Sequence, residues 1–232
     1  MRLPWGKRVE NLSSLAFPRT ASVSRKCAWP YAEIAERLAS AILLLAFGPL
    51  LLAAAVLIFF LSGRSPWIAH RRLGRYGTEL WVPKLRTMWH RRERLSALSR
   101  LFAIEYIDDE AGPALKAPED ARVGGRFARF CRRHSLDEIP QLLLVSTGRM
   151  SLVGPRPVTP GELALIYGPD AEIILSAKPG LSGLWQVSGR NRLTSRERRA
   201  ADLESVRNRS LRLYLTVLLR TVPEVLWGRN TW

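Results

Sequence analysis

The stretch that decides the fold is LASAILLLAFGPLLLAAAVLIFFLSG, residues 38–63, which contains no charged side chain. It is longer than the ~20 apolar residues that a helix needs to cross a bilayer. A signal peptide begins with a short basic segment, whereas 37 residues precede this stretch. The sequence therefore predicts a helix held in a membrane.

Two features of this segment bear on its topology. Gly48 and Pro49 lie near its middle, where proline removes a backbone donor and bends a helix. Its flanks are both basic: Arg19, Arg25, Lys26 and Arg37 precede it, and Arg64, Arg71, Arg72 and Arg75 follow it. Because basic flanks stay in the cytoplasm, the pattern favours a hairpin that enters and leaves on one face. A kinked transmembrane helix remains an equal alternative on these residues alone.

The composition indicates an anionic partner in a reducing compartment. The chain has 232 residues and a formal net charge of +16, as expected for a protein that meets nucleic acid, lipid headgroups or a phosphorylated substrate. Cys27 and Cys131 stand far apart without metal-ligand spacing. A disulfide scaffold or a zinc site is therefore not expected.

Beyond Gly63 the sequence predicts a mixed α/β domain, mostly helical with short strands. Residues 66–90 read as strands and turns, 89–103 as a helix, and 108–125 as a loop. Two stretches, 151–162 and 177–192, read as rigid loops rich in proline and glycine. Residues 195–229 read as a basic amphipathic helix, with apolar residues at Leu211, Leu215, Leu218, Val222 and Leu226. This helix either lies on an anionic membrane surface or packs its apolar stripe in the core.

The stretch RFARFCRRHSLDEIPQ, residues 126–141, places two adjacent carboxylates after a run of arginines. Asp137 and Glu138 have a plain structural interpretation, because Ser135 and Glu138 fit a capping box. Alternatively, Asp137 is itself the N-cap, with Pro140 in the first turn. The alternative is that the pair does chemistry on an anion that the arginines hold.

Four blocks occur in a characteristic order: KLRTM (84–88), RRHSLDEIPQLL (132–143), MSLVGPRPV (150–158) and KPGLSGLWQVSGRN (178–191). Together they resemble the bacterial sugar transferases, monotopic enzymes that transfer a hexose-1-phosphate to a polyprenyl phosphate. The resemblance runs from about residue 33 to 229 and, through GPRPVTPGELALIYG, points to the exopolysaccharide branch that uses galactose or glucose. It implies a proline-broken re-entrant helix, a cytoplasmic catalytic domain and amphipathic helices at the interface. The expected divisions are a basic extension at 1–32, the membrane helix at 33–63 and the catalytic domain at 64–232.

The resemblance also implies a reaction and its residues. Asp137 is the expected nucleophile, which takes the sugar phosphate from a UDP-sugar, releases UMP and passes the group to undecaprenyl phosphate. With Glu138 it is also the expected Mg²⁺ site, because divalent metal and positioned cations offset the repulsion between carboxylate and diphosphate. Further residues are expected to bind substrate: Lys84, Arg86 and Arg156 as phosphate clamps, and Gly189, Arg190 and Asn191 on the nucleotide or headgroup side.

The expected location is the bacterial inner membrane, with the catalytic domain facing the cytoplasm. The expected partners are the UDP-sugar, undecaprenyl phosphate and anionic inner-membrane lipids, with a homodimer left open. Two other classes compete. A membrane-anchored scaffold without activity would not need the acidic pair, and a membrane-tethered nucleic-acid binder would interleave its aromatic and basic residues in one patch. We therefore expect no nucleic-acid partner.

Overall fold

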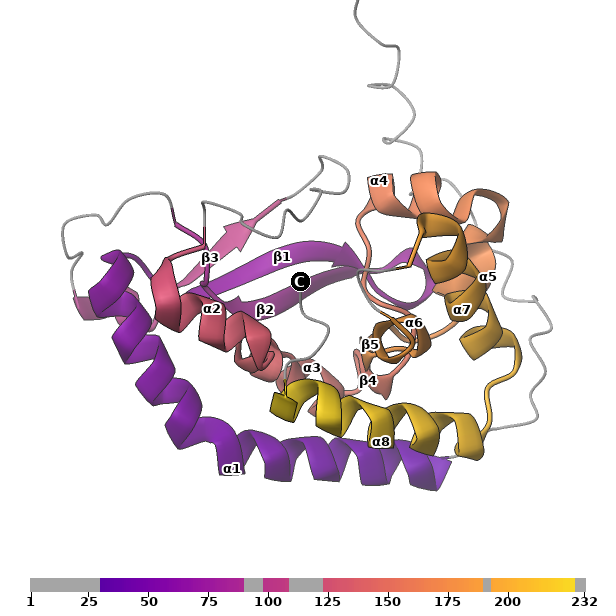
Figure 1. Cartoon of the computed structure of the whole chain (residues 1–232), viewed down its shortest axis with the longest axis horizontal. Helices are drawn as coiled ribbons and strands as arrows, with labels where there is room; N and C mark the ends of the chain where they lie inside the picture. Colours follow the sequence, from indigo (N-terminus) through magenta and orange to yellow (C-terminus); the bar gives the residue numbers. More distant parts are fainter. Residues whose placement is uncertain (1–29, 90–97, 109–122, 190–192, 228–232) are drawn as a thin grey trace, which may run out of the picture.

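The computed structural model describes residues 30–89, 98–108, 123–189 and 193–227 (Figure 1). It is a mixed α/β structure in which helices predominate, as the sequence predicted. The α-helices are α1 (Pro30–Ser62), α2 (Gly125–Arg133), α3 (Leu142–Ser146), α4 (Pro160–Glu162), α5 (Ala171–Leu175), α6 (Leu184–Val187), α7 (Ser195–Arg207) and α8 (Leu211–Trp227). Five short helical turns, mostly 3₁₀, join them: η1 (Arg75–Gly77), η2 (Leu98–Leu101), η3 (Leu136–Gln141), η4 (Leu163–Tyr167) and η5 (Gly168–Asp170).

Helix α1 is the predicted apolar segment, and it continues through Pro49 instead of ending there. Figure 1 shows that it bends along its length, and a proline inside a helix is the usual cause of such a bend. Of the helices in the described residues, it is the one long and apolar enough to cross a membrane. Its two halves differ: Leu45 is 79% exposed, whereas Ala55 and Ile58, after the proline, are fully buried.

A three-stranded sheet forms the first part of the domain, in the order β2-β1-β3. Strands β1 (Trp67–Leu73) and β2 (Glu79–Leu85) are antiparallel, while β3 (Ile104–Ile107) runs parallel to β1. Strands β1 and β2 lie within the stretch at 66–90 that was predicted as strands and turns, whereas β3 lies beyond it and was not predicted. The predicted helix at 89–103 falls mostly outside the described residues, and its described end is the turn η2. Most of the predicted loop at 108–125 also lies outside them.

A second pair of strands joins the two stretches that read as rigid loops. Strand β4 (Ser151–Val153) runs parallel to β5 (Gly180–Ser182), and α6 follows directly. The backbones approach closely here, since a Cβ added to Gly180 would lie 2.1 Å from the nitrogen of Gly154. The loop predictions were therefore wrong for β4 and α4 within 151–162 and for β5 and α6 within 177–192. Glycine and proline in this stretch mark a close backbone contact as well as a turn.

Three apolar clusters stabilise the domain, and α1 supplies one of them. Residues Leu51, Ala54, Ala55 and Ile58 of α1 pack against Leu85, Trp67, Trp89, Phe127 and Ile139. The second cluster lies between η4, α5 and α7, and the third joins β2 to α3 and Met150. The half of α1 beyond the proline is thus part of the core that also supports the candidate site.

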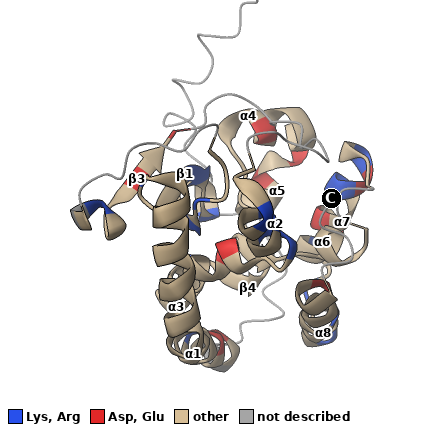
Figure 2. Cartoon of the chain, turned by 60° about the vertical axis from the view of Figure 1, so that its left-hand side comes forward, with Lys and Arg blue, Asp and Glu red and all other residues tan. Residues whose placement is uncertain are grey.

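The predicted helix at 195–229 is divided into α7 and α8, which are separated by Asn208–Ser210. Thr194 caps α7 through a capping box with Glu197. The apolar stripe of α8 faces outward, with Leu211, Leu215, Val222 and Leu226 all exposed. Core packing of this stripe was therefore the wrong alternative for four of the five residues. In Figure 1, α8 and the first part of α1 lie along the lower side of the molecule, and the rest of α1 rises along the left side; Figure 2 also shows α8 at the lower side.

Candidate active site

Two cations converge on one carboxylate oxygen at the centre of the domain. Lys84 Nζ lies 3.0 Å from Glu138 Oε1, and Arg156 Nη1 lies 3.6 Å from the same atom. Lys84 is near the end of β2, Glu138 is in η3, and Arg156 follows β4. Residues that are far apart in sequence thus meet at one point. Their side chains keep between 15% and 25% exposure, so solvent and a ligand can reach them.

The capping interpretation of this stretch is wrong. Ser135 precedes η3 in the left-handed region, with φ of 54°, and its side chain makes no capping hydrogen bond. The Glu138 carboxylate pairs instead with Lys84. Helix η3 continues directly into α3, so the two acids still lie in the first turn of a helical run, where negative charge is favourable. The pairing of Glu138 with Lys84 is a further interaction, which a capping box does not explain.

Asp137 stands beside Glu138 and over a buried thiol. The Cys131 side chain is fully buried beneath it, and burial, followed by the negative charge of Asp137, raises the pKa of that thiol to about 12. A thiol with such a pKa stays protonated at neutral pH and does not act as a nucleophile. Of Cys131 and Asp137, it is therefore Asp137, with its partly exposed carboxylate, that can attack a ligand.

The segment that carries Arg156 is held rigidly on both sides. Gly154 N donates to Ser182 O at 2.9 Å, and Gly180 N donates to Pro155 O at 2.8 Å, so β5 fixes the start of the segment. Thr159 begins α4 with a capping box to Glu162, which fixes its end. Proline on either side restricts the backbone of Arg156. The guanidinium group is therefore presented from a stiff support.

Sequence reasoning missed a buried acid behind Arg156. Asp202 of α7 is fully buried and accepts a hydrogen bond of 2.6 Å from the Tyr167 hydroxyl. Burial raises the pKa of Asp202 to about 6, and the positive charges of Arg198 and Arg156 partly oppose that shift. The only signal in the sequence was an acid within a helix whose neighbours Leu203 and Val206 are apolar. That pattern alone does not separate a buried acid from an exposed one.

Other predicted site residues lie elsewhere. The buried guanidinium of Arg86 donates from Nε to Ser65 O at 2.7 Å and also pairs with Glu105, so it links strand ends and is not brought to Glu138. Gly189 follows α6 with φ of 149°. Arg190 and Asn191 lie outside the described residues. Gly48 and Pro49 lie within α1, away from the carboxylates in sequence, and Pro49 is exposed.

The acidic pair suits a magnesium ion shared with a substrate. No group of three or more acidic, histidine or cysteine side chains with metal-binding geometry occurs in the described part of the chain. Mg²⁺ does not need such a group, since it commonly takes one or two carboxylates and completes its shell with phosphate oxygens and water. Asp137 and Glu138 offer hard oxygen donors next to each other. These donor types therefore fit Mg²⁺.

Comparison with known proteins decides the family. The family described as bacterial sugar transferase matches residues 28–228, which is most of the chain. The chain belongs to the bacterial sugar transferase family. Within this family it is 40% identical over 196 residues to the exopolysaccharide production protein ExoY of Rhizobium meliloti, with 84% of this chain and 85% of that protein covered.

Two further relatives of this sugar transferase have names that state a reaction. The chain is 36% identical to the UDP-glucose:undecaprenyl-phosphate glucose-1-phosphate transferase of Caulobacter vibrioides, with 93% of this chain and 74% of that protein covered. It is 40% identical to the undecaprenyl-phosphate galactose phosphotransferase of Salmonella typhimurium, with 68% of this chain and 32% of that protein covered. The family resemblance inferred from the four sequence blocks is thus confirmed.

Proposed function

We propose that this chain transfers a hexose-1-phosphate, galactose or glucose, from a UDP-sugar to undecaprenyl phosphate and so starts the assembly of an exopolysaccharide or another surface glycan. The observation that carries this proposal is the convergence of Lys84 and Arg156 on Glu138, directly beside Asp137. The names of the relatives agree with it, since they include a glucose-1-phosphate transferase and an exopolysaccharide production protein.

The chemistry proceeds in two displacements. An oxygen of the Asp137 carboxylate attacks the phosphorus that bears the sugar, and the bond to the bridging oxygen breaks, so UMP leaves. A phosphate oxygen of undecaprenyl phosphate then attacks the same phosphorus and frees the carboxylate. Covalent catalysis of this kind replaces one difficult transfer between two anions by two easier ones.

The cations have a defined part in this reaction. Lys84 and Arg156 already face an anionic oxygen, that of Glu138, and a phosphate oxygen of the donor presents the same kind of charge to them. The donor competes with Glu138 for these cations, so the carboxylate acts as a stand-in anion until substrate arrives. A Mg²⁺ ion held by Asp137 and Glu138 would supply further neutralisation of the diphosphate. Its placement is part of the proposal.

The membrane placement completes the proposal. Helix α1 dips into the cytoplasmic leaflet and returns, and α8 lies on the same surface with its exposed apolar stripe toward the lipid. Support comes from the bend in α1 (Figure 1), from the basic flanks and from the exposed apolar residues on both helices. This arrangement keeps the active site at the inner membrane, where a cytosolic UDP-sugar and the phosphate of the lipid acceptor meet.

The reaction is tested by UMP release from purified protein with undecaprenyl phosphate, Mg²⁺ and a panel of UDP-sugars. Incubation with the UDP-sugar alone should add one sugar phosphate to the peptide that contains Asp137, as seen by mass spectrometry. No UMP from any donor in the panel would refute the reaction. UMP release that strictly requires the lipid acceptor would refute the covalent intermediate and leave direct transfer.

The topology is tested by single cysteines at positions 10, 20 and 195 in a background that lacks Cys27 and Cys131. All three should resist impermeant thiol reagents in intact cells and react once the membrane is opened. If the cysteine at position 10 or 20 reacts from outside, α1 spans the bilayer and the re-entrant arrangement is wrong.

A further inference from the structure

A cavity lies behind the segment that carries Arg156. Its enclosed volume is about 30 Å³, and it is open to solvent. Its walls come from Gly154 and Pro155 after β4, from Lys178 before β5, and from the turn between α7 and α8. Arg156 is not part of these walls, because its side chain turns toward Glu138. The cavity and the acidic pair therefore lie on different sides of one short segment.

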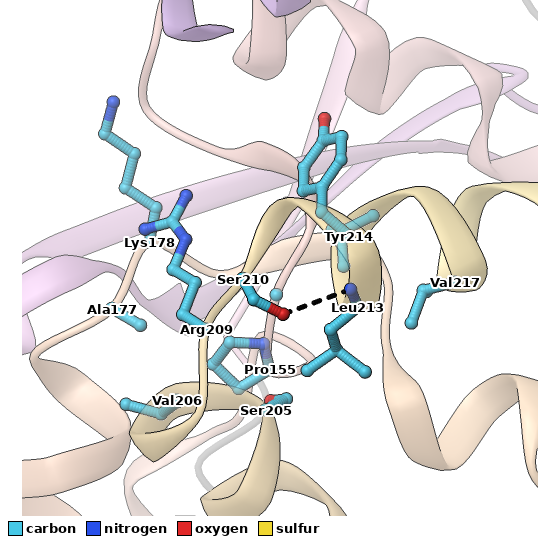
Figure 3. Close-up of a pocket in the computed structure, with 12 residues that line it drawn as sticks. Pro155, Ala177, Lys178, Ser205, Val206, Arg209, Ser210, Leu213, Tyr214 and Val217 are labelled. Carbon is cyan, nitrogen blue, oxygen red and sulfur yellow. Dashed lines mark hydrogen bonds between the residues drawn. The ribbon is translucent and has the colours of Figure 1, made fainter. Parts of the chain in front are cut away.

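The lining combines apolar walls with two cations. Pro155, Val206, Leu213 and Val217 supply apolar surface, while Lys178 and Arg209 supply positive charge. Figure 3 shows the side chains of Lys178 and Arg209 next to each other and pointing the same way. The residues that line the cavity include no carboxylate. A ligand with a negative head and an apolar body matches this surface.

Two carboxylates of α1 lie near the cavity, and their negative charge counts against that of these cations. Glu33 pairs with Lys178 Nζ at 3.0 Å, and Arg37 and Arg209 also act on its charge. Glu36 accepts hydrogen bonds from Tyr214 and Ser151 and is buried. The three cations thus outnumber the two acids. Arg209, which is exposed, is the cation most able to turn to a ligand.

The cavity lies at the level of the two helices that we place at the membrane. Lys178 and Tyr214 line it and contact Glu33 and Glu36 at the start of α1. Next to these contacts, Ile34 and Leu38 on α1 and Leu211 on α8 are more than half exposed. A lipid whose chains lie among these residues would bring its headgroup to Lys178 and Arg209.

We propose that this cavity binds the phosphate headgroup of an anionic phospholipid from the surrounding membrane. The inference rests on the proposed membrane placement but not on the transfer reaction. The acceptor lipid is a poorer occupant, because its phosphate must reach Asp137 on the other side of the Gly154–Arg156 segment. A bound phospholipid packs against Pro155 and so stabilises the segment that presents Arg156, which couples the lipid composition to the activity.

Binding is measured on the purified full-length chain in neutral detergent micelles, without UDP-sugar, by native mass spectrometry with phosphatidylglycerol or phosphatidylcholine. Wild-type protein should retain phosphatidylglycerol in preference to phosphatidylcholine. Arg209→Gln and Lys178→Gln should each weaken retention about fivefold, as expected for one cation near a lipid phosphate. Arg212→Gln is the matched control, because Arg212 is an exposed residue of α8 that does not line the cavity. It should change retention less than about twofold.

The outcomes separate this site from its alternatives. Equal retention of the two lipids, or equal losses in Arg209→Gln and Arg212→Gln, would overturn the proposal. Displacement of phosphatidylglycerol by an equal concentration of inorganic phosphate would show a site for free anions instead. Displacement by undecaprenyl phosphate, with a raised KM for that acceptor in Arg209→Gln, would assign the cavity to the acceptor. Because the binding readout needs no turnover, an inactive protein that prefers phosphatidylglycerol would sink the proposed reaction and leave this site standing.

Discussion

Replacing Glu138 by glutamine should make the protein bind UDP more tightly while it slows the reaction. The substitution keeps the size of the side chain and removes the charge that Lys84 and Arg156 face at 3.0 Å and 3.6 Å. At an effective dielectric constant of about 20, each contact has a gross Coulomb energy of about 5 kcal/mol. The side chains are 15% to 25% exposed, so desolvation and screening reduce the net value of each pair to about 1 kcal/mol.

Once Glu138 is neutral, both cations are available to the diphosphate. Each cation pair contributes about 1 kcal/mol, and UDP is expected to regain one contact fully and the other only in part. UDP should therefore bind about tenfold more tightly. The assay is isothermal titration calorimetry with UDP in the presence of EDTA, so that a lost metal ligand does not enter the comparison. With Mg²⁺ and a UDP-sugar, the same variant should show a kcat lowered by about a hundredfold or more, because a charged group at the reacting centre is gone.

Glu172→Gln is the control for the loss of one negative charge, since Glu172 is exposed on α5. It should leave UDP affinity in EDTA within about twofold of wild type. Unchanged or weaker UDP binding by Glu138→Gln under these conditions would refute the view that Glu138 holds the phosphate-binding cations in reserve. A thermal unfolding curve on each variant shows whether the fold is intact.

Three other changes have defined outcomes. Asp137→Asn keeps the size of the side chain, so it should alter the free energy of unfolding by less than about 1 kcal/mol. It should lower UMP release at least about 10⁴-fold, and a well-folded variant with a near wild-type rate would exclude Asp137 as the nucleophile. Pro49→Leu restores a backbone donor within α1. A fraction of molecules should then span the membrane, so that a single cysteine at position 10 reacts with an impermeant thiol reagent from outside. Labelling identical to that of the protein with Pro49 would show that proline does not set the bend. The pKa of Asp202 is raised from 3.8 to about 6, so the folded state holds this proton more tightly, and wild-type stability falls as pH rises from about 4 to about 6. Asp202→Asn does not lose stability in this way, so the difference in Tm between the variant and wild type should be more positive at pH 7 than at pH 4.5. A Tm difference that is the same at both pH values would contradict the raised pKa.

Much of the fold followed from local patterns, and the exceptions have physical causes. The apolar run gave α1, and alternation between glycine-marked turns gave β1 and β2, because these signals are read within one element. Strand β5 was missed because parallel pairing with β4 joins residues about thirty positions apart and leaves no local period. The outward stripe of α8 stayed undecided for a related reason: periodicity shows that a helix has an apolar face but not what covers it.

The site divides in the same way. The sequence identified Asp137, Glu138, Lys84 and Arg156, and the structure brings both Lys84 and Arg156 to the carboxylate of Glu138. Arg86 belongs to the same sequence block as Lys84, but it lies just beyond the end of β2. Its side chain therefore has different neighbours, and it pairs with Glu105. Tyr167 and Asp202 were missed because a buried hydrogen bond between η4 and α7 is a tertiary event.

The packing of α1 also has a consequence for the order in which the protein is made. Ala55 and Ile58 leave the ribosome before the partners outside α1 that they pack against, since Leu85, Phe127 and Ile139 all follow later in the chain. The newborn helix therefore carries an apolar surface with no protein to cover it, and such surfaces aggregate in water. Lipid can shield that surface until Ile139 has been made. We expect the bilayer to serve first as a chaperone for this chain, and only afterwards as the place where it works.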